Sequence, residues 1–207
     1  ASIVASNDLD EQIIESLKAQ GAKIAVWGVG TKLVTAYDQP ALGGVYKLGA
    51  MKDVQGEWQP KIKLSEQGAK TTIPGMLQVR RFHVDDKLTG DMIYDTSSGI
   101  DSRGVIFDVK DSNRRKRIPK GSVGDDLLIP VFRGGELTGP FADGTETLEV
   151  ARTRAARELT QLDPSVLRLL NPHEYPVGLD VGLHERRDQM VRELRWSSAK
   201  HEGRGKP

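Results

Sequence analysis

The sequence predicts a chain of mixed class, α/β followed by β, and three observations predict it. Residues 1–44 hold two apolar runs that enclose a segment with helical spacing, which is the pattern of a βαβ unit. Residues 45–144 contain many short β-type segments separated by Gly, Asp and Pro. Residues 145–207 show two helical patterns and a polar tail. We therefore expect a small α/β unit, a β-rich domain, and C-terminal helices with a tail.

Composition excludes several classes of protein. The chain has 207 residues, a net charge of +1 and no cysteine, which excludes a disulfide scaffold, a thiolate metal site and a cysteine nucleophile. The near-neutral charge argues against binding to nucleic acid or to a membrane surface. No apolar run approaches the length of a membrane span, and the first residues do not resemble a signal peptide. We expect a cytoplasmic protein with no membrane or nucleic-acid partner and no metal site of its own.

The first region is expected to contain two parallel strands joined by a helix. Residues 2–5 and 23–27 are short apolar runs typical of buried strands. A capping box formed by Asp8 and Glu11 should begin the helix, and Gly21 should end it. The side chains expected on one helical face are Leu9, Ile13, Ile14 and Leu17.

The second region is expected to fold as a small antiparallel sandwich or barrel. Turn signals at Thr89-Gly90 and Arg133-Gly134-Gly135 have the spacing of hairpins. The clearest β-type segments are Lys61–Leu64, Met76–Val79, Met92–Tyr94 and Val105–Val109.

The third region should begin with a helix whose apolar residues run from Leu148 to Leu162 and which Asp163-Pro164 stops. A last helix is expected over about 182–196, followed by a frayed tail over 197–207.

A glycine-containing loop is the main candidate for a binding site. The sequence Gly28-Val29-Gly30-Thr31 follows the second strand, where glycines let backbone N–H groups approach an anion and the Thr31 hydroxyl adds a donor. Asn7 and Asp8 follow the neighbouring strand, so both loops should open on the same side. We interpret them as a shared phosphate-ester site, although a purely structural turn explains the glycines equally well. A dinucleotide fingerprint fits poorly because Leu33 occupies the third glycine position.

Four segments carry a family resemblance. Val4–Glu11, Trp27–Thr35, Asp38–Leu48 and Asn171–Val177 resemble motifs of bacterial nicotinate phosphoribosyltransferase, a type II phosphoribosyltransferase. The resemblance implies the C-terminal part of an incomplete, TIM-like α/β barrel together with a β-rich domain. It also implies transfer of phosphoribose from phosphoribosyl pyrophosphate to nicotinate in NAD biosynthesis and salvage, with release of pyrophosphate, hydrolysis of ATP, a requirement for Mg²⁺, and a homodimer.

The resemblance also implies roles for particular residues. Gly28, Gly30 and Thr31 would hold the 5′-phosphate, and Asn7 and Asp8 would line the ribose-phosphate side. The catalytic residues, the pyridine-carboxylate clamp and a phosphorylatable histidine belong to an N-terminal half that is not in this sequence, which would be a partner of this chain. The histidines present do not match that motif; they are His83, His173, His184 and His201.

The remaining candidates have simpler structural explanations. The basic run 114–117 is expected to be a solvated hairpin loop rather than a phosphate or nucleic-acid grip. The acidic pairs 85–86 and 125–126 could bind a hard cation, but both look like turns. His83 should be half-buried or on the surface, Asp8 could be a carboxylate of the reaction or a helix cap, and the expected core tryptophans are Trp27 and Trp58.

Alternative functions remain open at this point. The chain could be a non-catalytic β-rich binding or structural module whose βαβ unit only packs against it. It could also belong to another phosphate-binding barrel enzyme, such as a nicotinamide or quinolinate phosphoribosyltransferase, since the residues that choose the substrate lie outside this sequence.

Overall fold

A computed structural model describes residues 1–41, 43–65 and 71–202, with side chains to residue 197. The chain divides into two compact units, Ala1–Tyr46 with Arg168–Pro172, and Lys47–Leu167 with His173–Pro207. The first break falls close to the expected boundary after Gly44. The expected boundary after residue 144 has no counterpart in this division, because a C-terminal strand and helix complete the sheet of the second unit.

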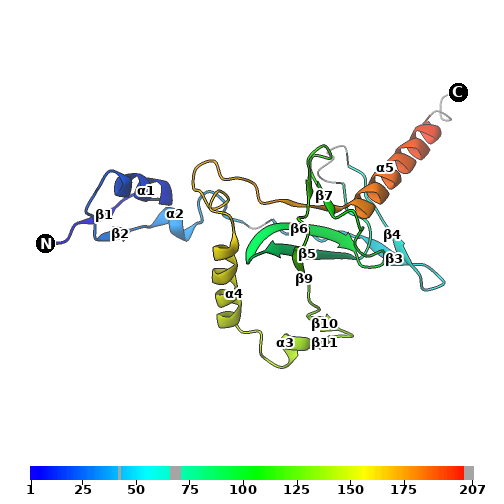
Figure 1. The fold of residues 1–207 in the computed structure, drawn as a ribbon, viewed down its shortest axis with the longest axis horizontal. Coiled ribbons are helices and arrows are strands. Elements are labelled where there is room, and N and C mark those ends of the chain that lie inside the picture. Colours follow the sequence, from blue (N-terminus) through cyan, green and yellow to red (C-terminus); the bar gives the residue numbers. More distant parts are fainter. Residues whose placement is uncertain (42, 66–70, 203–207) are drawn as a thin grey trace. The chain divides into compact units, whose positions relative to one another are not determined.

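The first unit contains the expected βαβ arrangement. Strand β1 (Val4–Ser6) pairs in parallel with β2 (Val26–Gly28), and helix α1 (Glu11–Ala19) connects them (Figure 1). A short helix, α2 (Thr31–Val34), follows β2 directly. In the described segments 1–41, 43–65 and 71–202, β1 and β2 form a sheet of two strands.

The ends of α1 differ slightly from the prediction. The N-cap is Asp10, whose Oδ1 accepts a hydrogen bond from the Ile13 N–H at 2.7 Å; it is not Asp8, which lies before the helix with a φ of 48°. Gly21 follows the C-cap with a φ of 80°, so the predicted glycine stop is confirmed.

The described residues of the second unit are built on a six-stranded sheet with the order β8-β7-β12-β6-β5-β9. Figure 1 labels β5, β6, β7 and β9 of this sheet. All pairs are antiparallel except β12 with β6, which is parallel. The expected antiparallel sandwich or barrel is therefore wrong, and the sheet is mixed. Its strands are β5 (Leu77–Val84), β6 (Lys87–Asp95), β7 (Val105–Asp108), β8 (Arg115–Arg117), β9 (Val123–Asp126) and β12 (Val177–Asp180).

Strand β12 explains why the sheet is mixed. It comes from the C-terminal region, where helices and a tail were expected, and it lies between β6 and β7. Its four residues include Gly178, and a Cβ at that position would collide with the Phe107 carbonyl of β7. A short segment with a central glycine gives a weak strand signal, because glycine is depleted in strands and usually marks close backbone contact.

The turn between β5 and β6 is Asp85-Asp86. Both residues have positive φ, 48° and 61°, as a two-residue type I′ hairpin requires, so the turn expected there is confirmed. The turn predicted at Thr89-Gly90 is wrong, because both residues lie inside β6 at a bulge: Phe82 pairs with Gly90 and His83 with Leu88, which leaves Thr89 unpaired.

Two small hairpins complete the β structure. Strand β3 (Ala50–Lys52) pairs with β4 (Trp58–Pro60). The strand predicted over Lys61–Leu64 is wrong in position, because β4 ends at Pro60. Strand β10 (Phe132–Arg133) pairs with β11 (Glu136–Leu137) across Gly134-Gly135, which confirms the turn predicted at Arg133-Gly134-Gly135.

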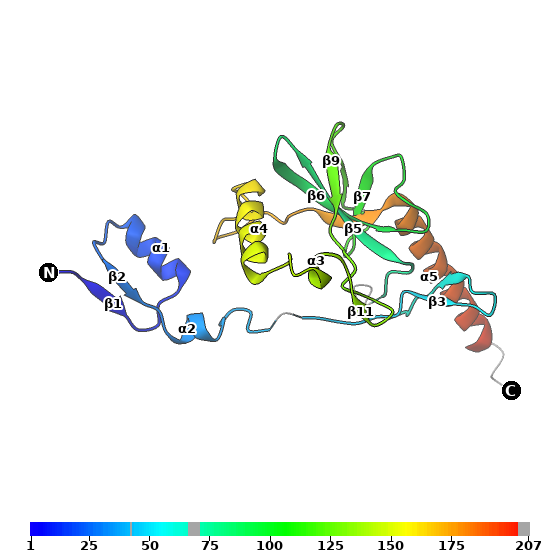
Figure 2. The same cartoon turned by 90° about the horizontal axis from the view of Figure 1, so that it is seen from below.

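In the part of the second unit that the structure describes, the helices are α3 (Gly139–Ala142), α4 (Leu148–Gln161) and α5 (Val181–Glu202) (Figure 2). The prediction of α4 and its stop before Asp163 is confirmed. The last helix continues past its expected end at Trp196 through to Glu202, so the expected fraying from residue 197 is wrong as far as 202; residues 203–207 lie outside the described part.

The core of the second unit lies where β6, β7 and β12 meet the start of α5. Met92, Ile106 and Ile118 form a buried cluster, and Leu179 and Leu183 are also fully enclosed. The Asp180 side chain fixes this junction, because it accepts hydrogen bonds from the N–H groups of Asp101 and Gly182 at 3.0 and 2.9 Å. None of the described helices is long and apolar enough to cross a membrane.

Candidate functional site

The first unit brings the two predicted loops together. Because β1 and β2 are parallel and Ser6 pairs with Gly28, Asn7-Asp8 and Val29-Gly30 leave neighbouring strands at the same edge. Asn7 and Asp8 turn away from β1 with φ values of 82° and 48°, and both side chains are exposed. The expectation that both loops open on one side is therefore confirmed at the level of the backbone.

The loop after β2 presents polar hydrogens to solvent. Helix α2 begins at Thr31, so the N–H groups of Thr31 and Lys32 have no intrahelical acceptor. The Thr31 hydroxyl is exposed and has no hydrogen-bond partner among the described residues. This arrangement matches the predicted set of donors for a phosphate oxygen, without itself identifying a ligand.

The two loop glycines differ in what surrounds them. A Cβ at Gly28 would lie 3.2 Å from the Ser6 Cβ, so this glycine allows the two strands to lie close together. A Cβ at Gly30 would meet nothing within 4 Å. Gly30 has a φ of −107°, so a positive φ is not the reason for a glycine at this position. Because glycine has no side chain, the space next to its Cα is open.

An ion pair joins the two helices that follow the strands. Lys32 Nζ lies 2.5 Å from Asp10 Oδ2, while Asp10 Oδ1 caps α1. The hydrogen bond from Lys32, and then that from the Ile13 N–H, lower the pKa of Asp10; the same pair raises the pKa of Lys32. Both groups are therefore charged at neutral pH, and Lys32 is largely neutralised by Asp10.

A cavity of about 470 Å³ lies beside this pair, and Val29 is the residue of the predicted loop that lines it. It is lined by residues of α1 and α2 and by the segment after α2, including Ile14, Leu33 and Tyr37. None of the five predicted site residues, Asn7, Asp8, Gly28, Gly30 and Thr31, lines it. The predicted loop is thus an open surface of the first unit rather than an enclosed pocket.

Most of the other candidate residues have structural explanations. The run 114–117 forms edge strand β8 and the turn before it, so it is exposed as expected, but it is strand rather than loop. The pair 125–126 is not a turn, because it lies in β9 opposite Arg81 and Arg80. Trp27 is half-buried, whereas Trp58 is 48% exposed and lies beside Lys52 rather than in the core.

The histidines are spread over the second unit. His83 is half-buried in β5, as expected, with Nε2 3.4 Å from Asp125 Oδ2. His184 stacks on Phe107 at 4.3 Å between ring centroids, and His173 is exposed. The side chain of His201 lies outside the described part of the chain.

A network that the sequence did not predict holds the C-terminal segment to the sheet. Arg81 binds both oxygens of Asp91 at 3.0 and 2.8 Å and reaches Glu158 of α4 at 2.7 Å. The Tyr175 hydroxyl donates to the same Asp91 at 2.9 Å, and burial followed by the charge of Asp91 raises the pKa of Tyr175. The only sequence signal was that Tyr175 lies in the segment Asn171–Val177.

A second group on the other face of β5 resembles the first. Arg80 binds both oxygens of Asp126 at 2.8 and 3.0 Å, and the Tyr94 hydroxyl donates to Asp126 at 3.0 Å. These contacts, with Arg80 first, lower the pKa of Asp126. Consecutive strand residues face opposite sides, so Arg80 and Arg81 each find a carboxylate on their own face.

The described residues contain no group of three or more His, Asp, Glu or Cys side chains placed to hold a metal ion. The pairs 85–86 and 125–126 belong to no such group among these residues.

Comparison with known proteins identifies the family. Residues 78–187 match the family model described as the nicotinate phosphoribosyltransferase C-terminal domain. The chain is 36% identical over 199 residues to the nicotinate phosphoribosyltransferase of Bacillus subtilis, an alignment that covers 94% of this chain and 39% of that protein. It is 31% identical over 178 residues to the human enzyme, covering 86% of this chain and 32% of that protein.

A solved structure agrees in fold. The crystal structure of human nicotinic acid phosphoribosyltransferase matches with a TM-score of 0.57 and 24% identity, over 92% of this chain and 33% of that chain. The chain thus spans well under half the length of the relatives that it matches. Because the family model alone covers more than half of the sequence, the chain belongs to the nicotinate phosphoribosyltransferase family.

Proposed function

We propose that this chain is the C-terminal portion of a nicotinate phosphoribosyltransferase, an enzyme of NAD biosynthesis. The observation that carries the proposal is the alignment with the Bacillus subtilis enzyme, which extends over 94% of the chain and includes both units. The proposed reaction joins the ring nitrogen of nicotinate to C1 of phosphoribosyl pyrophosphate. The bond from C1 to the pyrophosphate oxygen breaks, and nicotinate mononucleotide and pyrophosphate are the products.

In this proposal the loops after β1 and β2 bind the phosphoribosyl group. The N–H groups at the start of α2 and the Thr31 hydroxyl donate to the 5′-phosphate, and the space above Gly30 admits it. Asn7 and Asp8 lie at the neighbouring strand end, where they would face the ribose. The exposed donors of this loop support the assignment, because a phosphate would satisfy groups that have no partner among the described residues.

The exposed apolar face of the first unit supports an incomplete barrel. Val4 and Val26 pair across β1 and β2, yet they are 62% and 51% exposed. Parallel strands are normally covered on both faces. We propose that further strands of the same enzyme, from the part of the protein that precedes this chain, cover this face and supply the catalytic residues and the nicotinate clamp.

Hydrolysis of ATP, a requirement for Mg²⁺, a homodimer and a cytoplasmic location belong to the same proposal and rest on the family. The described residues offer no cage of carboxylates for Mg²⁺. The described residues therefore do not fit a resident metal site.

The test is an assay of the whole protein that contains this chain. With nicotinate, phosphoribosyl pyrophosphate, ATP and Mg²⁺, we expect nicotinate mononucleotide and pyrophosphate in equal amounts, resolved by anion-exchange chromatography. Nicotinamide and quinolinate in place of nicotinate test the related transferase activities. Turnover of either of these in preference to nicotinate would overturn the proposed substrate, and absence of all three products would favour a non-catalytic module.

A further inference from the structure

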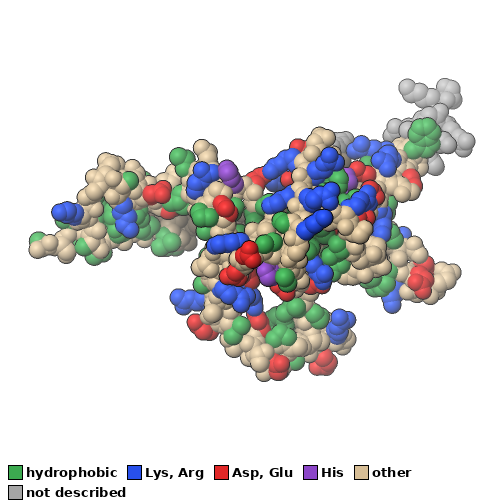
Figure 3. All heavy atoms as spheres, viewed as in Figure 1, with side chains coloured by type: hydrophobic (Ala, Val, Ile, Leu, Met, Phe, Trp, Pro, Cys, Tyr) green, Lys and Arg blue, Asp and Glu red, His purple; other side chains and the backbone are tan. Residues whose placement is uncertain are grey.

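The hairpin of β7 and β8 concentrates positive charge. Between residues 101 and 120 there are seven Lys and Arg against three Asp, in a chain whose net charge is only +1. Figure 3 shows Lys and Arg side chains gathered on the surface over the β7 region. A local excess of cations raises the concentration of anions at such a surface.

A cavity of about 510 Å³ lies between this hairpin and the segment Glu174–Val177. Its volume is in the range of roughly 300–1,000 Å³ that is usual for small-molecule sites. Part of its wall is apolar, formed by Ile106, Val109, Tyr175, Pro176 and Val177. The charged part of the lining consists of Asp108, Lys110, Arg114, Arg115, Lys116 and Glu174.

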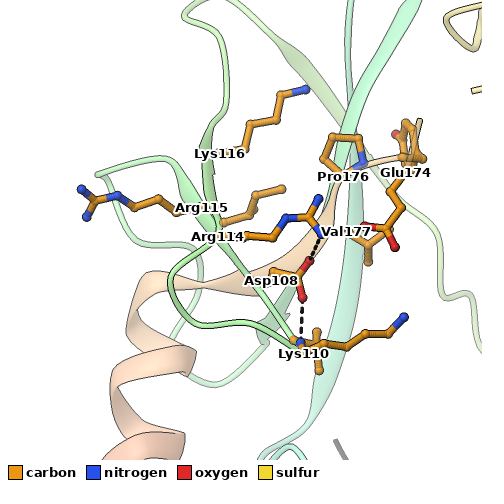
Figure 4. A pocket seen from close by; sticks show the side chains of 11 residues that line it. Asp108, Lys110, Arg114, Arg115, Lys116, Glu174, Pro176 and Val177 are labelled. Atoms are coloured by element: carbon orange, nitrogen blue, oxygen red, sulfur yellow. Dashed lines mark hydrogen bonds and ion pairs between the residues drawn. The ribbon is translucent and has the colours of Figure 1, made fainter. Parts of the chain in front are cut away.

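Arg114 is the central cation of this cavity. Its Nη1 lies 2.6 Å from Glu174 Oε2 and 3.7 Å from Asp108 Oδ2 (Figure 4). The Asp108 carboxylate is also fixed from behind by the N–H groups of Lys110 and Asp111, which together with the charge of Arg114 lower its pKa. Glu174 has no such second anchor among the described residues, and its side chain is 65% exposed.

The other cations of the lining are not equivalent. Figure 4 shows the Arg115 side chain extending away from Asp108, as expected for the residue after Arg114 in a strand. Lys116 Nζ donates to the Thr89 carbonyl at 2.7 Å. The ammonium group of Lys110 makes no hydrogen bond or ion pair among the described residues, although its charge helps to lower the pKa of Asp108, so it can reach an anion in the cavity.

We propose that this cavity is a second binding site, for a small molecule of mononucleotide size that carries a phosphate group on a planar or apolar body. The phosphate replaces the exposed Glu174 carboxylate on Arg114 and gains Lys110, while the body lies against the wall formed by Tyr175 and Pro176. Guanidinium groups bind phosphate and carboxylate with the same forked geometry, so the two exchange readily. The site lies wholly in the second unit and does not depend on the transferase reaction proposed for the first unit.

The experiment is isothermal titration of the whole protein with adenosine monophosphate, with inorganic phosphate and adenosine as partial probes. We expect the monophosphate to bind more tightly than either part alone. Arg114→Ala should weaken its binding about tenfold or more, because a charge-assisted hydrogen bond is lost. Glu174→Gln should instead tighten binding, because the competing carboxylate is removed.

Matched controls separate this site from others. Lys120→Ala removes an exposed cation of the same hairpin that does not line the cavity, and it should leave binding unchanged. Thr31→Ala tests whether the probe occupies the proposed phosphoribosyl loop instead, and a loss of binding in Thr31→Ala with none in Arg114→Ala would overturn the second site. Melting temperatures check that each variant is folded.

The proposal is overturned if adenosine monophosphate does not bind to the wild type or to Glu174→Gln. It is equally overturned if binding is unchanged in both Arg114→Ala and Glu174→Gln, or if Lys120→Ala weakens binding as much as Arg114→Ala does. The transferase assay is independent of all these outcomes, so the second site and the proposed function can fail separately.

Discussion

Lys32 Nζ lies 2.5 Å from Asp10 Oδ2, and this contact ties the helix that follows β2 to the helix that follows β1. The same Asp10 caps α1 through its other oxygen. One carboxylate therefore fixes both loops of the proposed phosphoribosyl site, although it lies outside the set of residues that the sequence indicated.

The first prediction separates the two roles of Asp10. Asp10→Asn should keep the N-cap, since Asn caps as well as Asp, but lose the ion pair, whereas Asp10→Ala should lose both. We expect the melting temperature of the first unit to fall in the order wild type, Asn, Ala, as followed by circular dichroism of the whole protein. Equal melting temperatures for Asn and Ala would mean that the cap contributes nothing.

The second prediction concerns the Thr31 hydroxyl. Thr31→Ala should weaken binding of phosphoribosyl pyrophosphate about ten- to a hundredfold, because a charge-assisted hydrogen bond is worth roughly 1.5–3 kcal/mol. Melting without ligand should not change, since the hydroxyl has no protein partner among the described residues. Isothermal titration of the whole protein measures the affinity. The control is Thr35→Ala, whose hydroxyl donates to the Thr31 carbonyl within α2 at 2.7 Å; a loss of affinity of the same size there would contradict the assignment.

The third prediction uses the open space at Gly30. A Cβ at Gly30 meets no atom within 4 Å, so the side chain of Gly30→Val has room in the ligand-free protein. The same side chain occupies the space that the phosphate needs, so affinity for phosphoribosyl pyrophosphate should fall at least as far as in Thr31→Ala. A variant that binds normally would show that the glycine is only a tight turn.

The fourth prediction concerns the network around Asp91. Arg81→Met removes the main partner of the Asp91 carboxylate, whose side chain is only 8% exposed. We expect this to lower the free energy of unfolding by about 3 kcal/mol. Tyr175→Phe removes one hydrogen bond to the same carboxylate and should cost about 1 kcal/mol. Arg154→Met breaks a partly exposed pair with Glu146 and removes a weaker interaction with Glu158, so it is the comparison, with a smaller expected loss than Arg81→Met. Urea denaturation of the three variants checks this order, which a loss in Arg154→Met equal to that in Arg81→Met would contradict.

The helical and turn elements were predictable because their signals are local. The spacing of apolar residues located α1 and α4, Gly21 marked the end of α1, and Gly134-Gly135 marked a hairpin. The parallel pairing of β1 and β2 was also predictable. A connection that contains a helix is long enough to carry the chain back, so that the second strand runs in the same direction as the first.

The mixed sheet was not predictable in the same way. Strand β12 has four residues, and its partners β6 and β7 lie some 70 to 90 positions earlier in the chain, so no local pattern reports the pairing. At Thr89-Gly90 a local signal was present but was misinterpreted. The glycine was interpreted as part of a turn, whereas it lies at a β-bulge inside β6.

The candidate site shows the same difference between local signals and contacts that are distant in sequence. The parallel register brought Asn7-Asp8 and the loop after Gly28 together as expected, because strand ends are fixed by local pairing. Contacts between side chains distant in sequence could not be anticipated. Lys32 with Asp10, and Tyr175 with Asp91, are 22 and 84 positions apart.

The fifth prediction concerns pH. The hydrogen bonds from Arg103, through its side chain and its backbone N–H, lower the pKa of Asp101 to about 2. A carboxyl whose pKa is depressed by folding stabilises the native state above its unfolded pKa of about 3.9, and this contribution is lost as pH falls toward 2. Arg103→Gln should raise the pKa of Asp101 toward its ordinary value and shift acid unfolding to higher pH. Carboxyl-carbon NMR titration measures the first effect. An unchanged pKa of Asp101 would show that Arg103 does not cause the lowered value. The control is Arg117→Gln, which removes a neighbouring cation but keeps the contacts between Arg103 and Asp101.

Isolation of this chain should abolish the proposed activity and expose an apolar face. Val4 and Val26 lie on the side of β1 and β2 that nothing in the first unit covers, and exposed apolar strands pair with other chains. We therefore expect the 207-residue chain, produced alone, to associate in sedimentation experiments and to form no nicotinate mononucleotide. Lys substituted at both positions should keep it dispersed without restoring turnover, because the residues that bind nicotinate lie elsewhere in the proposed enzyme. The whole protein should be both dispersed and active. Steady turnover by the isolated chain would show instead that these two units hold a complete transferase site.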